Sequence, residues 1–134
     1  MISKNIQDWT VLIVDDELDN LNVARKVLNY NGAQVYVARN GVEGLAMLAD
    51  LKPTFVLLDL SMPEMDGWEM FKHMRLRPEL SQTPVIALTA HVMSGDREKV
   101  IDAGFNGYIA KPFRIDSFLD EIHRCLEEFQ EPNE

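Results

Sequence analysis

Five polar side chains of this 134-residue chain stand at or just after the ends of short aliphatic runs, and their types suit work on phosphate. They are Asp15, Asp16, Asp59, Thr89 and Lys111. Carboxylate oxygens are ligands of hard divalent cations, while a hydroxyl and an ammonium group can donate to a phosphoryl oxygen. A carboxylate beside a metal ion and a lysine can also act as a nucleophile toward phosphorus. The residue types therefore suggest phosphoryl transfer at an acidic metal site.

These side chains can act together only if the aliphatic runs before them are neighbouring strands of one sheet. The pattern predicts five strands, at Thr10–Val14, Ala33–Ala38, Thr54–Leu58, Pro84–Thr89 and Gly107–Ala110. Between and after them it predicts five helices, at Leu18–Tyr30, Gly41–Leu51, Gly67–Arg77, Ser94–Ala103 and Ile115–Phe129. The helical segments carry apolar residues at helical spacing on one face.

The alternation of these elements predicts an α/β fold with a doubly wound parallel sheet. The strands are apolar on both faces, as in the runs VLIV from Val11 and FVLL from Phe55, which is typical of parallel strands covered on both sides. Gly32 and Gly104 stand where helices should end, and Asn40 with Glu43 resembles a helix-starting capping box. Ligands of such sheets bind beyond the carboxyl ends of the strands, so the polar residues there should converge.

Three carboxylates gathered at one edge would repel one another. Two charges about 4 Å apart cost on the order of 4 kcal/mol at an effective dielectric near 20. Either one carboxylate takes up a proton or a cation neutralises the group. Mg²⁺ fits best, because it prefers few carboxylates, several waters and a substrate phosphate. Lys111 is expected to pair with Asp59 at rest and with a phosphoryl oxygen later.

Each of these residues also has an ordinary explanation when it is taken alone. Asp15 or Asp16 could cap the helix that follows. A threonine at the end of a strand is often structural, and a single lysine is most often solvated. The shared position on four different strands favours a common site, but the pattern by itself leaves both explanations open.

Composition excludes several classes of function. The apolar content of 46% and charged content of 26% fit one ordinary globular domain. With 13 basic and 22 acidic residues the net charge is −9, which argues against direct binding of nucleic acid. Cys125 is the only cysteine, so an intramolecular disulfide is excluded, and we interpret it as a core residue rather than a reactive thiol. The chain shows no signal peptide or membrane-spanning run, so the cytoplasm is the expected location.

Four segments resemble the response-regulator receiver domains of two-component systems, in particular those of the chemotaxis-regulator type. They are VLIVDDE from Val11, LLDLSMPEMDG from Leu57, PVIALTA from Pro84 and GYIAKPF from Gly107. The resemblance covers residues 10–129, with 1–9 as an N-terminal extension and 130–134 as an acidic tail. It implies the flavodoxin-like strand order 2-1-3-4-5. A stand-alone receiver is the expected arrangement, although a domain of a larger regulator would look similar.

The resemblance implies a role for each acidic residue. Asp59 would accept a phosphoryl group from a phosphohistidine on a sensor histidine kinase or a histidine phosphotransfer protein. Asp16, Asp59 and the backbone carbonyl of Ser61 would ligate Mg²⁺ directly, with Mn²⁺ as a substitute, and Asp15 would hold the ion through water. Such a domain is a switch that assists only its own phosphotransfer and autodephosphorylation, not an enzyme with an external product.

Further residues would read out the phosphorylated state. Thr89 and Lys111 would bind phosphoryl oxygens, Thr89 would move toward them, and Tyr108 would turn inward. This change would repack the surface made by the fourth helix, the fifth strand and the fifth helix, where an unknown downstream protein binds. Tyr108 could equally be an ordinary half-buried aromatic. The family also implies a cis bond before Pro112 and a monomer or weak dimer.

Two positions beside the site vary within the family. Ser61 and His91 stand two residues after Asp59 and Thr89, where the family tunes the phosphate lifetime. His91 could approach the phosphoryl group or be an exposed loop residue.

The loop after Asp59 is interpreted as structural. Pro63 would form a rigid turn, and Gly67 would let the third helix start close to the site. Trp68, at the start of that helix, is expected to be partly exposed.

Three other functions were weighed against a receiver. A phosphatase of the haloacid-dehalogenase type needs Asp-x-Asp after its first strand, whereas here Asp15 and Asp16 are adjacent. A flavodoxin-like cofactor carrier needs a phosphate-binding loop there, which the acidic run from Asp15 to Asp19 would repel. A receiver-like scaffold that is never phosphorylated usually loses part of the acidic set, and here the set is complete.

Overall fold

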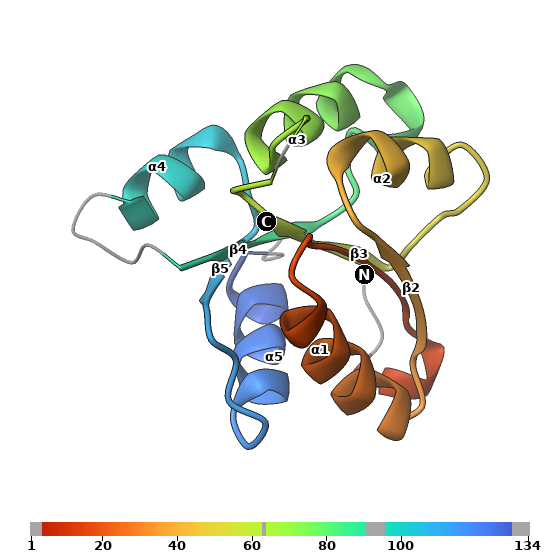
Figure 1. The fold of residues 1–134 in the computed structure, drawn as a ribbon, viewed down its shortest axis with the longest axis vertical. Coiled ribbons are helices and arrows are strands. Elements are labelled where there is room, and N and C mark those ends of the chain that lie inside the picture. The colour runs from red at the N-terminus through yellow and green to blue at the C-terminus, as the bar shows by residue number, and fades with distance from the viewer. Residues whose placement is uncertain (1–3, 63, 91–95, 130–134) are drawn as a thin grey trace.

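The computed structural model describes residues 4–62, 64–90 and 96–129, and it contains one five-stranded parallel sheet (Figure 1). The strands are β1 (Thr10–Val14), β2 (Gln34–Ala38), β3 (Phe55–Asp59), β4 (Val85–Thr89) and β5 (Tyr108–Ala110). Their order across the sheet is β2-β1-β3-β4-β5, with every pair parallel. The predicted doubly wound α/β class and its strand order are therefore confirmed.

Helices cover both faces of this sheet. They are α1 (Leu18–Tyr30), α2 (Gly41–Met47), α3 (Gly67–Leu76), α4 (Asp96–Ala103) and α5 (Phe118–Phe129). Figure 1 shows α1 and α5 on one side of the sheet and α2, α3 and α4 on the other. No helix in the described ranges is long and apolar enough to cross a membrane.

The central strands feed two separate cores, one on each face of the sheet. Leu12 and Val56 contribute to the core under α2, α3 and α4, whereas Val11 and Phe55 contribute to the core under α1 and α5. Successive side chains of a strand point to opposite faces, so a strand that is buried on both faces must be apolar throughout. Burial of both faces explains why β1 and β3 appear in the sequence as unbroken aliphatic runs.

Local capping sets where several elements begin and end. Asn40 caps α2 by accepting a hydrogen bond from the Glu43 backbone N–H at 2.9 Å, as predicted. The Glu43 carboxylate accepts from the backbone N–H of Arg39, one residue earlier than a regular capping box would have it. Gly32 and Gly104 follow α1 and α4 with φ of 101° and 107°, a conformation that favours glycine.

Some predicted boundaries were wrong. Helix α2 ends at Met47 instead of Leu51. After Met47 the chain forms hydrogen-bonded turns, for example one closed by the bond from the Asp50 N–H to the Met47 carbonyl. Helix α5 begins at Phe118 instead of Ile115, since the preceding residues form a turn closed on the Arg114 carbonyl. The predicted start of α4 at Ser94 lies outside the described residues.

Two short 3-10 helices were not predicted, at Ile6–Asp8 and Pro78–Leu80. The first leads into Trp9, which is buried at the edge of the core under α1 and α5. The Trp9 ring meets Phe55 edge-on at 5.1 Å and lies 5.3 Å from His123. The chain ahead of β1 therefore contributes a large side chain to the core.

Candidate functional site

The carboxyl ends of four strands bring the predicted polar residues to one edge of the sheet. Asp15 follows β1, Asp59 is the last residue of β3, Thr89 ends β4 and Lys111 follows β5. Carboxylate oxygens of Asp15, Asp16 and Asp59 all lie within 4.8 Å of one another. The acidic cluster that the sequence predicted is present.

Lys111 is the cation at the centre of this cluster. Its side chain is only 7% exposed, and its Nζ lies 3.3 Å from Asp59 Oδ2 and 3.2 Å from Asp15 Oδ2. The predicted contact between Lys111 and Asp59 is thus present. The shortest contact was not predicted: Nζ donates to Glu17 Oε1 at 2.8 Å. Glu17 directly follows the aspartate pair, so its position in the sequence was the available signal.

Backbone donors fix one oxygen of each buried carboxylate. Asp15 Oδ1 accepts from the Glu17 N–H at 2.9 Å, and Asp59 Oδ1 accepts from the Ser61 N–H at 3.1 Å. Both bonds join residues two apart, so the local turn holds each carboxylate in place. The second oxygen of each carboxylate, Oδ2, lies near Lys111 Nζ instead.

Burial makes the ionised form of Asp59 costly. The pKa of Asp59 is raised to about 7, chiefly because burial removes the carboxylate from water and also because Asp15 is close. The Ser61 N–H and Lys111 oppose this rise. For Lys111, burial lowers the pKa, but contacts with Glu17, Asp15 and Asp59 outweigh it and the net pKa is raised. The hydrogen bond from Lys111 in turn lowers the pKa of Glu17.

Two buried oxygens have no hydrogen-bond partner within the described part of the chain. They are Asp15 Oδ2 and Asp59 Oδ2, in side chains that are essentially inaccessible. Both lie 3.2 to 3.3 Å from Lys111 Nζ but receive no well-directed hydrogen bond. An unpartnered buried carboxylate oxygen is expensive, and a hard cation would satisfy both at once. The donor set is all carboxylate oxygen, so it fits Mg²⁺.

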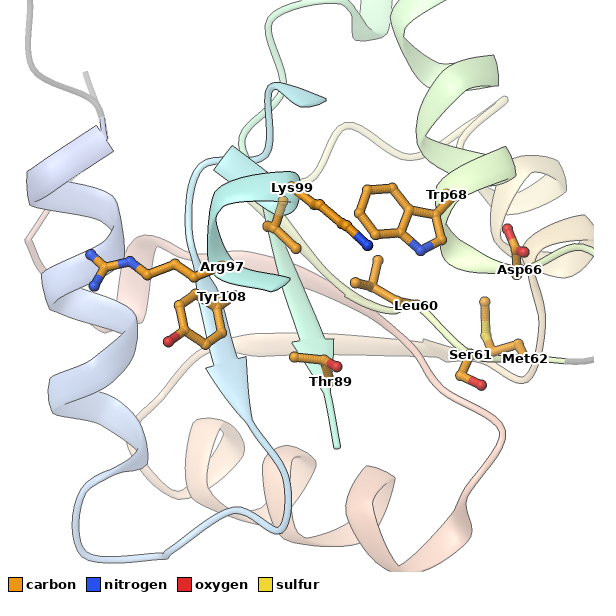
Figure 2. Close-up of a pocket in the computed structure, with 10 residues that line it drawn as sticks. Leu60, Ser61, Met62, Asp66, Trp68, Thr89, Arg97, Lys99 and Tyr108 are labelled. Carbon is orange, nitrogen blue, oxygen red and sulfur yellow. The ribbon is translucent and has the colours of Figure 1, made fainter. Parts of the chain in front are cut away.

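A cavity of about 630 Å³ is lined by Leu60 and Ser61, which directly follow Asp59 in the chain (Figure 2). Thr89 and Tyr108, the two predicted switch residues, both line it, together with Ser61 and Trp68. Arg97 of α4 also lines the cavity and lies over the Tyr108 ring at 5.9 Å. The space that an inward turn of Tyr108 would need is therefore adjacent to Thr89.

Two backbone features predicted near the site are present. The Lys111–Pro112 peptide bond is cis, as the resemblance implied. At Gly67, an added Cβ would press on the carbonyl oxygen of Asp59 and lie 2.8 Å from Leu60 Cα. The prediction that Gly67 lets α3 start close to the site is confirmed. His91 and Pro63 lie outside the described residues.

Two side-chain predictions away from the acidic cluster are also confirmed. Cys125 is buried, as expected of a core residue. Trp68 is 37% exposed and packs edge-on against Phe105 at 5.5 Å.

The fold and this acidic edge indicate a signalling domain, and comparison with known families agrees. Residues 11–123 match the model of the response regulator receiver domain. The chain belongs to this family, whose members are signalling switches of two-component systems.

Several relatives cover nearly the whole chain. The polar-differentiation response regulator DivK of Brucella anthropi is 34% identical over 117 residues, which are 87% of this chain and 95% of that protein. Among solved structures, the chemotaxis response regulator CheY4 of Vibrio cholerae has a TM-score of 0.82 at 28% identity, covering 88% of this chain and 98% of that one. The receiver domain of a Pseudomonas aeruginosa sensor histidine kinase, with a magnesium ion coordinated in its active site cleft, has a TM-score of 0.77 at 30% identity and covers 90% and 96% of the two chains.

Proposed function

We propose that this chain accepts a phosphoryl group on Asp59 from a phosphohistidine donor in a two-component pathway. The observation that carries the proposal is Asp59 Oδ2, a buried oxygen that faces Lys111 and the acidic pair and has no hydrogen-bond partner among the described residues. In the reaction this oxygen attacks phosphorus. A phosphorus–oxygen bond forms, the phosphorus–nitrogen bond breaks, and the imidazole nitrogen keeps the electron pair. The products are an aspartyl phosphate and a neutral histidine.

Residues around Asp59 would position and neutralise the transferred group. Asp16, Asp59 and the Ser61 carbonyl would hold Mg²⁺, with Asp15 acting through water and Mn²⁺ as a substitute. The ion, when bound, supplies positive charge to the phosphoryl oxygens. Lys111 would supply a second positive charge, and Thr89 a hydroxyl donor. The magnesium in the similar Pseudomonas receiver supports this assignment.

The phosphorylated domain would act by a population shift. Phosphorylation changes a surface only through its preference for one of two packings. Thr89 and Tyr108 line one cavity with Arg97 of α4, which supports a route from the phosphoryl group to the surface of α4, β5 and α5. A sensor histidine kinase or phosphotransfer protein would be the donor, and an unknown protein would bind that surface. Domain limits of 10–129, a monomer or weak dimer and a cytoplasmic location remain predictions.

Intact-mass measurement with small phosphodonors tests the proposal. Incubation with acetyl phosphate or phosphoramidate in Mg²⁺ should add the mass of one phosphoryl group, and a chelator should prevent the addition. Absence of an adduct has two explanations, rapid turnover or a silent scaffold. Binding of beryllofluoride, an aspartyl phosphate mimic, separates them: a domain that neither gains mass nor binds beryllofluoride is not a phosphoacceptor.

Magnesium should also raise the melting temperature, and Asp16→Ala should remove that effect. A ligand that binds only the folded state adds about 2.7 kcal/mol of stability at a hundred times its dissociation constant. Asp19→Asn in the first turn of α1 removes one exposed carboxylate outside the cluster and should keep the shift. The melting temperatures of the wild type and the two variants are measured by thermal denaturation at increasing magnesium concentrations. A shift that survives in Asp16→Ala would place the ion elsewhere.

A further inference from the structure

Glu17 stands at the rim of the phosphoacceptor site without belonging to the acidic cluster. Its carboxylate makes the shortest contact of Lys111, 2.8 Å, compared with 3.2 Å to Asp15 and 3.3 Å to Asp59. The Glu17 side chain is 60% exposed, whereas both aspartates are buried. Lys111 is therefore drawn toward solvent by one carboxylate and toward the interior by two.

A second contact fixes Glu17 in this position. Asn20, one turn along α1, donates its amide Nδ2 to the same oxygen, Glu17 Oε1, at 2.6 Å. The backbone N–H of Glu17 is anchored as well, by the bond to Asp15 Oδ1. Two polar groups therefore hold Glu17 so that it faces Lys111, and this contact is better defined than an ordinary surface ion pair.

We propose that Glu17 is a positioning residue that holds Lys111 at rest and competes with the phosphoryl group for it. The inference rests on the proposed function, in which Lys111 binds an oxygen of the group on Asp59. The Lys111 ammonium has three hydrogens, and one is directed at Glu17 at the closest distance of any contact. When a phosphoryl group arrives, it and Glu17 compete for the charge and the donors of this ammonium.

The negative charge of Glu17 and its contact with Lys111 both disfavour binding of an anionic phosphoryl group. Three carboxylates, of Asp15, Glu17 and Asp59, contact Lys111 at this edge, and incoming phosphodonors are anions. Glu17 repels the donor and withholds part of the cation that would attract it. Loss of the contact should therefore favour both capture of a donor and retention of the bound phosphoryl group.

Glu17→Gln tests the proposal against two matched variants. Glu17→Asp keeps the negative charge but is one methylene shorter, which withdraws the carboxylate from Lys111. Asp19→Asn makes the same change of charge on α1 at an exposed position outside the cluster. The full chain is used throughout, and the wild type is first shown to take up a phosphoryl group and to bind beryllofluoride, so failure of the proposed function would appear in the wild type itself.

The readouts are the affinity for beryllofluoride in Mg²⁺ and the dependence of the phosphorylation rate on acetyl phosphate concentration. Exposed ion pairs are worth roughly 0.2 to 1 kcal/mol, so Glu17→Gln should bind beryllofluoride about 1.4- to 5-fold more tightly and reach half its maximal rate at a correspondingly lower donor concentration. Glu17→Asp should lie between the wild type and Glu17→Gln, because it keeps the charge but loses the contact, and Asp19→Asn should follow the wild type.

Three results would overturn the proposal. Unchanged affinity in Glu17→Gln would mean that the contact does not compete. Weaker binding in Glu17→Gln would mean that Glu17 instead orients Lys111 for the phosphoryl group. Wild-type behaviour of Glu17→Asp beside a gain in Glu17→Gln would assign the effect to charge alone and not to the hold on Lys111.

Discussion

Asp59→Asn will take up no phosphoryl group, and near pH 7.5 without Mg²⁺ its free energy of unfolding will exceed that of the wild type by about 1 to 2 kcal/mol. The first effect follows because an amide oxygen is a poor nucleophile toward phosphorus. The second follows because the asparagine side chain fills the same volume without a buried charge. A residue that serves function at the expense of stability is expected to behave in this way.

The magnitude comes from the raised pKa of Asp59. The difference between about 7 in the folded protein and the ordinary value of 3.8 corresponds to about 4 kcal/mol at about 1.4 kcal/mol per pKa unit. Relaxation of the surrounding groups around the buried charge lowers this cost, so a gain of about 1 to 2 kcal/mol is expected. The variant also loses the ion pair between Asp59 and Lys111, which offsets part of the gain in stability.

The sign of the pH dependence follows from proton uptake. Between pH values near 4 and 7 the unfolded chain has already lost the Asp59 proton while the folded chain still holds it. The contribution of Asp59 to wild-type stability is therefore fully present below about pH 4 and is lost as the pH rises through about 7. Asp59→Asn lacks this dependence, so its advantage should shrink on acidification and disappear below about pH 4.

Urea denaturation at several pH values, without Mg²⁺, measures the stability effect, and intact mass measures phosphoryl uptake. Asp102→Asn is the control, since it removes an exposed carboxylate of α4 outside the acidic cluster. A variant that is less stable than the wild type, or whose advantage does not depend on pH, would contradict the account of Asp59 as a costly buried charge.

The acidic edge could be predicted from sequence because it depends on strand ends alone. Once β1 and β3 are recognised as strands buried on both faces, parallel packing places Asp15 and Asp59 at the same edge whatever the loops do. The edge strand β2 alternates between exposed and half-buried residues from Gln34 to Val37, so its apolar pattern predicts a strand less clearly. Its place between two predicted helices supported the prediction of a strand there.

The contact between Glu17 and Lys111 could not be predicted in the same way. The two residues are 94 positions apart, and their meeting depends on the side-chain conformations of two loops. No periodicity encodes such a contact. The start of α5 was missed for a related reason, because the turn closed on Arg114 is fixed by backbone hydrogen bonds and not by the apolar pattern.

Gly67→Ala should destabilise the protein by about 3 kcal/mol and slow phosphoryl uptake. The added methyl group would press on the carbonyl oxygen of Asp59 and lie 2.9 Å from its carbonyl carbon. These are backbone atoms of the last residue of β3, which is paired with Leu88 of β4, and the residue before it is paired with Val14 of β1. They cannot move aside without displacing Asp59, so the strain reaches the phosphoacceptor directly.

Gly44→Ala is the matched comparison, because the nearest atoms to its added methyl group belong to side chains, first the flexible end of Met70 at 2.8 Å from Cε. Alanine also favours a helix interior over glycine by roughly 0.5 to 1 kcal/mol, so Gly44→Ala should change stability by less than about 1 kcal/mol. Urea denaturation and the rate of mass gain with acetyl phosphate measure both variants. Equal stability losses in the two would mean that the close approach of α3 to β3 does not fix the position of Asp59. A larger loss in Gly67→Ala, with slower uptake, would mean that the glycine at the start of α3 sets the position of the nucleophile.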